Sequence, residues 1–169
     1  MRGMGALPSL TEPPKTDFRA AIRADKFWDR HTQRIFDAHG EALEDCVLQN
    51  REEVIGLMEF IEAHNIRSYL EIGVWTGRLT RLLHREFQFN RVAVADERYA
   101  ERKGMPIAVP TDADAFWGDS SSADFQAWRA ELGHIDLVFI DGNHTHAGVC
   151  RDFAINRAFP HRFLAFHDI

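Results

Sequence analysis

Acidic side chains recur in this 169-residue chain, each in or directly after a short apolar run. We expect these runs to be strands of a parallel sheet, because strands of this kind end together at one edge, where ligands bind. A single acid at a strand end usually only starts a turn or caps a helix. Five such ends in one chain indicate a shared polar site: Glu71, Asp96, Asp119, Asp141 and the pair His167-Asp168.

The first apolar run carries the pattern Glu71-x-Gly73-x-x-x-Gly77. A glycine at the end of a strand lets the backbone approach a ligand closely, and the second glycine permits a tight entry into the next helix. The spacing differs from the G-x-G-x-x-G pattern that seats a dinucleotide pyrophosphate. An acid beside the glycines would also repel a pyrophosphate, whereas it suits a ligand with a positive ammonium group.

Asp96 lies one predicted helix and one predicted strand beyond the glycines. A carboxylate at the end of the second strand accepts hydrogen bonds from both hydroxyls of a ribose. The acid and the glycine pattern together therefore predict an adenosine ligand with a cationic tail and no phosphates.

The elements that must position these residues alternate along the chain. Alternating strands and helices predict a parallel sheet with right-handed crossovers, and near-continuous apolar strands fit burial on both faces. The predicted class is therefore α/β, with a doubly wound, mainly parallel sheet. The segment 97–112, which holds Gly104, Pro106 and Pro110, favours no full helix. We expect strands at 68–73, 91–96, 115–119, 135–140 and 162–166, and helices at 78–87, 123–132 and 147–159.

A different pattern precedes the sheet. Residues 1–16, with three prolines and two glycines, predict a disordered lead-in. Apolar residues recur at helical spacing from Asp17 to Gln49, which predicts one or two amphipathic helices broken near residues 39–40, and a further helix is expected at 52–64. We expect three parts: the lead-in at 1–16, N-terminal helices at 17–66 that pack on the core, and a ligand-binding domain at 67–169.

Composition excludes several other functions. The net charge of −6 argues against nucleic-acid binding, which needs a basic surface. No run of about 18 apolar residues is present, so no membrane partner is expected. The two cysteines, Cys46 and Cys150, share no motif spacing and fit the reducing cytoplasm, where we expect the protein.

The site motifs resemble those of a known family. Tyr69-Leu-Glu-Ile-Gly-Val-Trp-Thr-Gly77 resembles motif I of class I S-adenosylmethionine-dependent methyltransferases. Val94-Ala-Asp96 resembles the strand whose acid holds the ribose, and Gly118-Asp119-Ser120 is similar to the segment that places an acid beside the adenine amino group. The resemblance implies a Rossmann-like methyltransferase fold.

Two further motifs are typical of one branch of that family. Phe139-Ile-Asp-Gly-Asn-His144 with Val149-x-x-Asp152, and the terminal Phe166-His-Asp168, resemble small-molecule O-methyltransferases and cephalosporin-hydroxylase-like proteins. The resemblance implies S-adenosylmethionine as cofactor and O-methylation of a small-molecule or sugar hydroxyl. The residues it assigns to cofactor binding are Glu71, Gly73, Trp75, Gly77, Asp96, Gly118, Asp119, Ser120 and Asp141.

The catalytic residues implied by the resemblance are Asp141, His144 and His167. Related metal-dependent methyltransferases place a divalent-ion triad after strands four and five, which implies Asp141, His167 and Asp168 as ligands. One histidine with two carboxylates suits Mg²⁺, Mn²⁺ or Fe²⁺. Alternatively His167-Asp168 is a structural pair, and His144 or His167 is a general base without a metal. A Zn²⁺ site at the pair His144 and His146 lacks a third nearby ligand.

The family continues beyond the position of Ile169 through another helix and an antiparallel pair of strands. We therefore expect either a fragment of a longer protein, or self-association through the exposed edge of the fifth strand. The first rival function is a truncated, non-catalytic module that binds the cofactor or a protein partner. The second is a nicotinamide-dependent oxidoreductase, against which the glycine spacing and Glu71 count.

Overall fold

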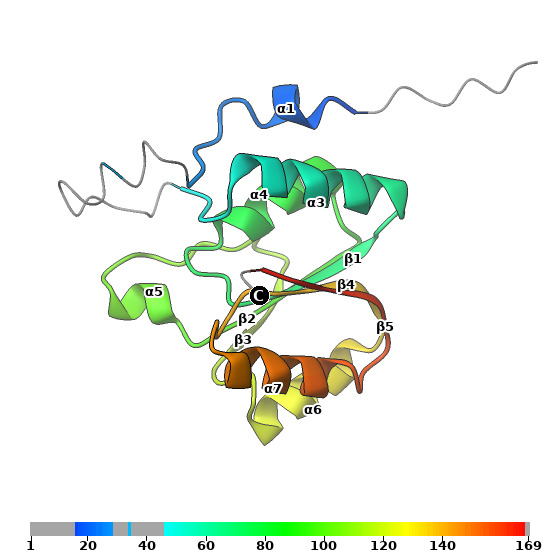
Figure 1. Cartoon of the computed structure of the whole chain (residues 1–169). Coiled ribbons are helices and arrows are strands. Elements are labelled where there is room, and N and C mark those ends of the chain that lie inside the picture. Colours follow the sequence, from blue (N-terminus) through cyan, green and yellow to red (C-terminus); the bar gives the residue numbers. More distant parts are fainter. Residues whose placement is uncertain (1–15, 29–33, 35–45, 168–169) are drawn as a thin grey trace, which may run out of the picture.

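The computed structural model describes residues 16–28, 34 and 46–167, and their centre is a five-stranded sheet (Figure 1). All four strand pairs are parallel, in the order β3-β2-β1-β4-β5. The chain order changes direction between β1 and β4, which creates the switch point at which such sheets bind ligands. The predicted α/β doubly wound sheet is confirmed. Its strands are β1 (Ser68–Ile72), β2 (Arg91–Asp96), β3 (Asp114–Trp117), β4 (Ile135–Ile140) and β5 (His161–Phe166).

Helices cover both faces of the sheet (Figure 1). The helices α3 (Arg51–Ala63) and α4 (Arg78–Phe87) lie on one face, and α6 (Ala123–Leu132) and α7 (His146–Asn156) lie on the other. Each of these four helices was expected from the sequence, and the bounds of α4 and α6 agree exactly. At the start of α3 the side chains and backbone amides of Asn50 and Glu53 form a reciprocal capping box, which explains why the helix begins there.

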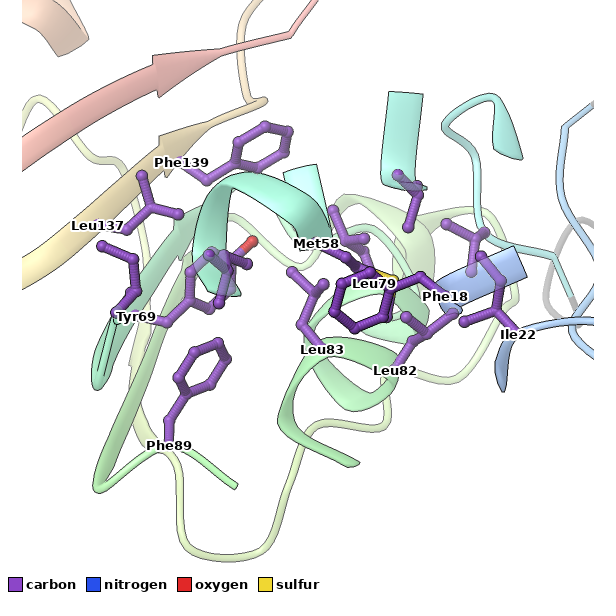
Figure 2. Close-up of a cluster of buried hydrophobic side chains, with 14 of the residues drawn as sticks. Phe18, Ile22, Met58, Tyr69, Leu79, Leu82, Leu83, Phe89, Leu137 and Phe139 are labelled. Carbon is purple, nitrogen blue, oxygen red and sulfur yellow. The ribbon is translucent and has the colours of Figure 1, made fainter. Parts of the chain in front are cut away.

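Successive side chains along β1 pack alternately into two separate hydrophobic cores. Tyr69 joins a cluster with Met58 of α3 and Leu83 of α4 (Figure 2), whereas Leu70 joins a cluster with Phe125 of α6. Successive residues of a strand point to opposite faces, so a continuous apolar strand fills both cores. The sheet is thereby held between two helical layers.

The prediction of helices from Asp17 to Gln49 is wrong for most of the described residues. The helix α1 (Phe18–Ala21) has only four residues. After it, Phe27 and Val47 form an isolated parallel bridge in extended chain. The break expected near residues 39–40 lies outside the described residues.

The physical reason is that burial, and not helix formation, accounts for the apolar spacing. Phe18, Ile22 and Val47 all belong to the same core as Met58, although most of the described residues between 17 and 49 are irregular. The guanidinium of Arg51 donates to the backbone carbonyls of Ile22 (2.8 Å) and Asp25 (2.9 Å), so these carbonyls are satisfied without a helix.

Between β2 and β3 the structure contains only the four-residue helix α5 (Tyr99–Arg102). Irregular chain follows it and lies against the turn before α4, where the amide of Ala108 donates to the carbonyl of Thr76 at 3.1 Å. The expectation of no full helix at 97–112 is confirmed.

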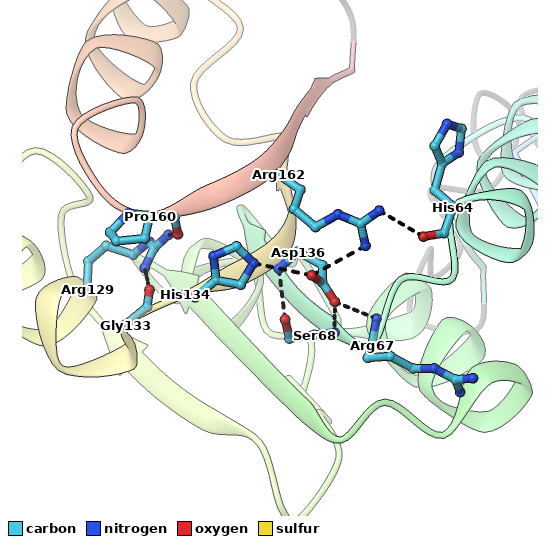
Figure 3. Close-up of polar contacts among 9 residues, drawn as sticks. All are labelled: His64, Arg67, Ser68, Arg129, Gly133, His134, Asp136, Pro160 and Arg162. Atoms are coloured by element: carbon cyan, nitrogen blue, oxygen red, sulfur yellow. Dashed lines mark hydrogen bonds and ion pairs between the residues drawn. The ribbon is translucent and has the colours of Figure 1, made fainter.

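One carboxylate aligns the start of three neighbouring strands (Figure 3). Asp136 of β4 accepts from the backbone amides of Arg67 (2.7 Å) and Ser68 (3.1 Å), and its own amide donates to the Ser68 hydroxyl at 2.8 Å. Arg162 of β5 lies 3.6 Å from Asp136 and donates to the carbonyl of His64. Burial raises the pKa of Asp136, but these partners outweigh it and hold the pKa below its usual value.

Within the described part of the chain, no helix combines the length and the apolar character that crossing a bilayer requires. In the same residues β5 is an edge strand of the sheet, paired only with β4.

Replacing Met58 by alanine should destabilise the protein by about 2–5 kcal/mol, because it opens a cavity where α3 meets the sheet. Met58 is 0% exposed. The control is Glu59→Ala, an exposed position on the same helix, which should change the free energy of unfolding by less than about 0.5 kcal/mol. Urea unfolding measures both, and equal effects would contradict the packing described above.

Candidate active site at the carboxyl edge of the sheet

Hydrogen bonds that continue past the strand ends bring the site residues together. The amide of Gly73 donates to Ala95 at 2.8 Å, and the amide of Asp141 donates to Ile72 at 2.8 Å. Two equivalent bonds, from Gly118 to Asp96 (2.9 Å) and from His167 to Ile140 (3.1 Å), extend the same row across the sheet. The first residues after β1, β3, β4 and β5 therefore lie side by side.

A cavity of about 950 Å³ opens at this edge. Most of the residues predicted for the site line it, namely Glu71, Gly73, Trp75, Asp96, Gly118, Ser120, Asp141, His144 and His167. Gly77 and Asp119 do not line it, and Asp168 lies outside the described residues.

The two glycines of the first motif are required by the protein itself. Gly73 has a φ of +86°, and a Cβ there would lie 2.3 Å from the carbonyl oxygen of Asp141. Gly77 has a φ of +78°, and a Cβ there would lie 2.3 Å from the carbonyl oxygen of Ala108. Both positions need a left-handed backbone without a side chain. Gly73 thus lets β1 and β4 meet at the cavity, and Gly77 begins α4.

Glu71 is buried at the base of the cavity and is only 1% exposed. Its carboxylate accepts from the hydroxyls of Thr80 (2.5 Å) and Tyr69 (3.0 Å). The pKa of Glu71 is raised to about 8, mainly by burial and in part by the nearby Asp141, against the hydrogen bond from Thr80, which lowers it.

Asp96 fixes the loop that follows β1. One carboxylate oxygen accepts from the amides of Val74 (3.0 Å) and Trp75 (3.3 Å), and the other accepts from the amide of Tyr99 (3.0 Å). A carboxylate can accept about four hydrogen bonds, so these three leave capacity for a ligand. The sequence indicated a ligand-binding acid here, and the structure shows that this acid also supports the loop.

An aromatic pair stands beside Asp96, and of its two rings Trp75 was predicted for the site whereas Tyr99 was not. The rings of Trp75 and Tyr99 lie 5.6 Å apart, and the guanidinium of Arg102 lies 5.3 Å from the Tyr99 ring. All three line the cavity. Trp75 has a φ of +52°, and its buried indole nitrogen has no hydrogen-bond partner among the described residues. Such unpaired buried donors are rare in folded proteins.

Asp141 is the centre of a polar cluster on the other side of the cavity. It accepts from the side-chain amide of Gln49, and it lies 3.1 Å from Nδ1 of His167 and 3.8 Å from Nε2 of His144. Nε2 of His167 lies 3.3 Å from Glu53. Burial raises the pKa of Asp141, while His167 and Gln49 act in the opposite direction. Gln49 and Glu53 carry no motif, so no local pattern could have identified them.

The described residues do not by themselves form a metal centre. Asp141 and His167 of the predicted triad are in contact, but both carboxylate oxygens of Asp141 already have protein partners. Among residues 16–28, 34 and 46–167, no three His, Cys, Asp or Glu side chains are arranged to hold a metal ion. His144 and His146 are both exposed, and His146 instead contacts Cys150 at 3.7 Å.

Asp119 and Ser120 point in different directions. Asp119 is exposed and accepts from the amide of Ser121 at 2.7 Å, which lowers the pKa of Asp119. The hydroxyl of Ser120, which lines the cavity, donates to the buried Asp152 at 2.7 Å. The assignment of both residues to cofactor binding stays a prediction.

The raised pKa of Glu71 makes stability depend on pH. The fold favours the protonated form, so the free energy of unfolding should fall as pH rises from about 4.5, the unfolded value, to about 8, the folded value. Glu71→Gln removes this dependence. Its stability relative to the wild type should therefore rise by about 3–5 kcal/mol between pH 4.5 and pH 8.5.

Urea unfolding at several pH values measures this difference. Asp141 and other shifted groups are present in both proteins, so they cancel in the comparison. Glu59→Gln, an exposed carboxylate on α3, is the control and should give no such trend. A constant difference between Glu71→Gln and the wild type would contradict the burial of a titrating carboxyl.

Comparison with solved structures shows the same fold elsewhere. A putative O-methyltransferase from Klebsiella pneumoniae matches with a TM-score of 0.53 and 16% identity, over 84% of this chain and 66% of that one. A putative caffeoyl-CoA O-methyltransferase from Staphylococcus aureus matches with a TM-score of 0.50 and 16% identity, over 75% of this chain and 66% of that one. The chain thus spans just under two thirds of the length of each.

Comparison with curated protein sequences finds no match. In contrast, residues 70–169 match a family model described as a methyltransferase domain. This match extends over more than half of the chain and includes the site residues from Glu71 to His167, which confirms the resemblance inferred from the motifs. The chain therefore belongs to the methyltransferase domain family.

Proposed function

We propose that this protein binds S-adenosylmethionine and transfers its methyl group to the hydroxyl of a small molecule or sugar. The observation that carries the proposal is that one cavity gathers the carboxylates of Glu71, Asp96 and Asp141 around Gly73 at the switch point of the sheet. Membership of the methyltransferase domain family supports it.

The residues present fit this cofactor. The carboxylates of Asp96 and Asp141 favour a ligand that carries a cationic ammonium and sulfonium, and such a ligand would also favour ionisation of Glu71. The cavity of about 950 Å³ is within the range of small-molecule sites. Asp96 would hold the ribose, and Glu71 and Asp141 would face the amino group. When bound, S-adenosylmethionine supplies an electrophilic methyl group.

His144 is the proposed general base. Its imidazole is half exposed at the cavity and lies 3.8 Å from Asp141, which would orient the ring and stabilise its protonated form. Both ring nitrogens of His167, in contrast, lie close to carboxylates, those of Asp141 and Glu53. We assign His167 to positioning Asp141 and not to proton transfer.

Assistance by Mg²⁺, Mn²⁺ or Fe²⁺ is a separate part of the proposal and depends on Asp168. Two of the three predicted ligands, Asp141 and His167, lie 3.1 Å apart and would have to give up this contact to bind a metal ion. Pairing of a second copy along β5, and a cytoplasmic location, stay predictions. The edge position of β5 supports the first, and the second is supported by Cys46 and Cys150, which form no disulfide with each other.

S-adenosylhomocysteine at about 100 times its dissociation constant should stabilise the fold by about 2.7 kcal/mol, whereas NAD should have no effect. Asp96→Ala should weaken binding of S-adenosylhomocysteine by about 1.5–3 kcal/mol, because hydrogen bonds to a charged group are lost. Asp124→Ala, an exposed acid on α6, is the control. Thermal shift and titration calorimetry measure these effects. Stabilisation by NAD alone would refute the proposed cofactor.

His144→Ala should lower the rate of methyl transfer by about 10²- to 10⁴-fold and leave the affinity for S-adenosylhomocysteine unchanged. The assay follows S-adenosylhomocysteine release with a panel of phenolic, aliphatic and sugar hydroxyl acceptors. Addition of EDTA tests metal assistance in the same assay. A wild-type protein that binds the cofactor and methylates no acceptor would instead support the rival function, a non-catalytic binding module.

A further inference from the structure

A second hollow, which we call the basic groove, lies along α4 and has a volume of about 360 Å³. The described residues that line it include one acid, Asp25, and four lysine or arginine side chains, namely Lys26, Arg78, Arg81 and Arg85. The chain as a whole carries a net charge of −6. The positive charge of the groove is therefore a local feature and not a property of the whole surface.

The single acid of the groove is already paired with one of these cations. The two carboxylate oxygens of Asp25 accept from the guanidinium of Arg85 at 3.1 and 2.8 Å, in a bidentate pair. The nearby Asp112 lies 3.4 Å from His84 and does not line the groove. The described lining of the groove therefore keeps a net positive charge after Asp25 and Arg85 compensate each other.

Arg81 is the cation that is open to a ligand. Its side chain is exposed and has no hydrogen-bond or ion-pair partner among the described residues. Arg78 is the first residue of α4, Arg81 follows one turn later, and the first turn contains no acid. The start of a helix carries a partial positive charge, so cations there are unfavourable unless an anion lies beside them. A bound anion would relieve this repulsion.

The arrangement favours a phosphate group as that anion. A carboxylate is satisfied by one arginine, as Asp25 is by Arg85. A phosphate has up to two charges and three strong acceptor oxygens, so it can bind several cations at once. Val47 and Leu82 form part of the wall, and the small volume of the groove accommodates a single group of this size and not a polymer.

Arg78 connects the basic groove to the candidate active site, because it lines both the groove and the cavity. A molecule whose phosphate lies in the groove can therefore extend past Arg78 into the cavity, which His144 also lines. Groove and cavity together are suited to one extended ligand with an anionic end.

We propose that the basic groove binds the phosphate of the acceptor, so that the substrates are small molecules that carry both a phosphate and a hydroxyl group. The proposal rests on the proposed function and narrows its substrate class. The phosphate anchors the acceptor and takes no part in bond making or breaking, and the hydroxyl that reaches the cavity receives the methyl group.

The first test is titration calorimetry with inorganic phosphate at constant ionic strength, with acetate as the comparison for general attraction of anions. The wild type should bind phosphate more tightly than acetate. Arg81→Gln should weaken phosphate binding at least about tenfold, as expected for the loss of a charge-assisted hydrogen bond. Arg67→Gln, an exposed arginine outside the groove (Figure 3), is the matched control and should leave it unchanged.

Affinity for S-adenosylhomocysteine separates loss of the groove from general damage to the fold. Arg81 does not line the cavity, so Arg81→Gln should leave this affinity unchanged. The second test compares glycerol, ribose and glucose with glycerol 3-phosphate, ribose 5-phosphate and glucose 6-phosphate, in binding and in S-adenosylhomocysteine release. At least one phosphorylated compound should bind more tightly than both its parent and inorganic phosphate, and Arg81→Gln should remove this preference.

Each outcome bears on one idea. Absence of phosphate binding, or equal binding by wild type and Arg81→Gln, would overturn the groove as a phosphate site. Phosphate binding that depends on Arg81, without tighter binding or methylation of any phosphorylated compound, would indicate a site for the free ion and overturn the substrate class. A protein that binds phosphate but not S-adenosylhomocysteine would overturn the proposed function and leave the groove as a phosphate site alone.

Discussion

The site depends on the parallel hydrogen-bond ladder, which continues one residue beyond the ends of the strands. Four backbone bonds join the first residues after β1, β3, β4 and β5 to the neighbouring strands, at 2.8–3.1 Å. A slip of one residue in any strand would turn its side chains to the opposite face. The register is set at the other edge by Asp136, which ties the start of β4 to β1 and contacts β5 through Arg162 (Figure 3). One partly buried carboxylate at the far edge therefore aligns the acids at the cavity.

The gathering of acids at one edge has an electrostatic consequence. Burial raises the pKa values of Glu71 and Asp141, and the nearby charge of Asp141 also raises the pKa of Glu71. The side chains of Thr80, Tyr69 and Gln49 are neutral donors to these carboxylates. Arg78 and Arg102 also line the cavity. A cationic ligand close to Glu71 and Asp141 would favour their ionised forms, because a nearby opposite charge lowers the pKa of a carboxyl group.

The N-terminal segment has a larger part in the site than its sequence indicates. Gln49 and Glu53 reach Asp141 and His167 from the start of α3, and Phe18 and Ile22 anchor the same region in the main core (Figure 2). These contacts join residues 92 and 114 positions apart in the chain. Part of the cavity wall beside Asp141 and His167 is therefore built by residues that precede the matched methyltransferase domain at 70–169.

What the sequence by itself determined was local. The strands, the helices α4 and α6, the left-handed glycines and the acids at the strand ends follow from periodicity, turn chemistry and motif spacing, all of which act over a few residues. The tertiary structure decided which of these residues meet. It turned Asp119 outward and Ser120 toward the cavity, although they are neighbours in one motif. It also brought Gln49, Glu53 and Asp152 to the site or its support through contacts between distant elements. The prediction of helices at 17–49 was wrong for the same reason. Apolar spacing indicates which residues are buried. Whether the buried backbone is helical or irregular depends on hydrogen-bond partners such as Arg51, which only the folded protein brings into contact.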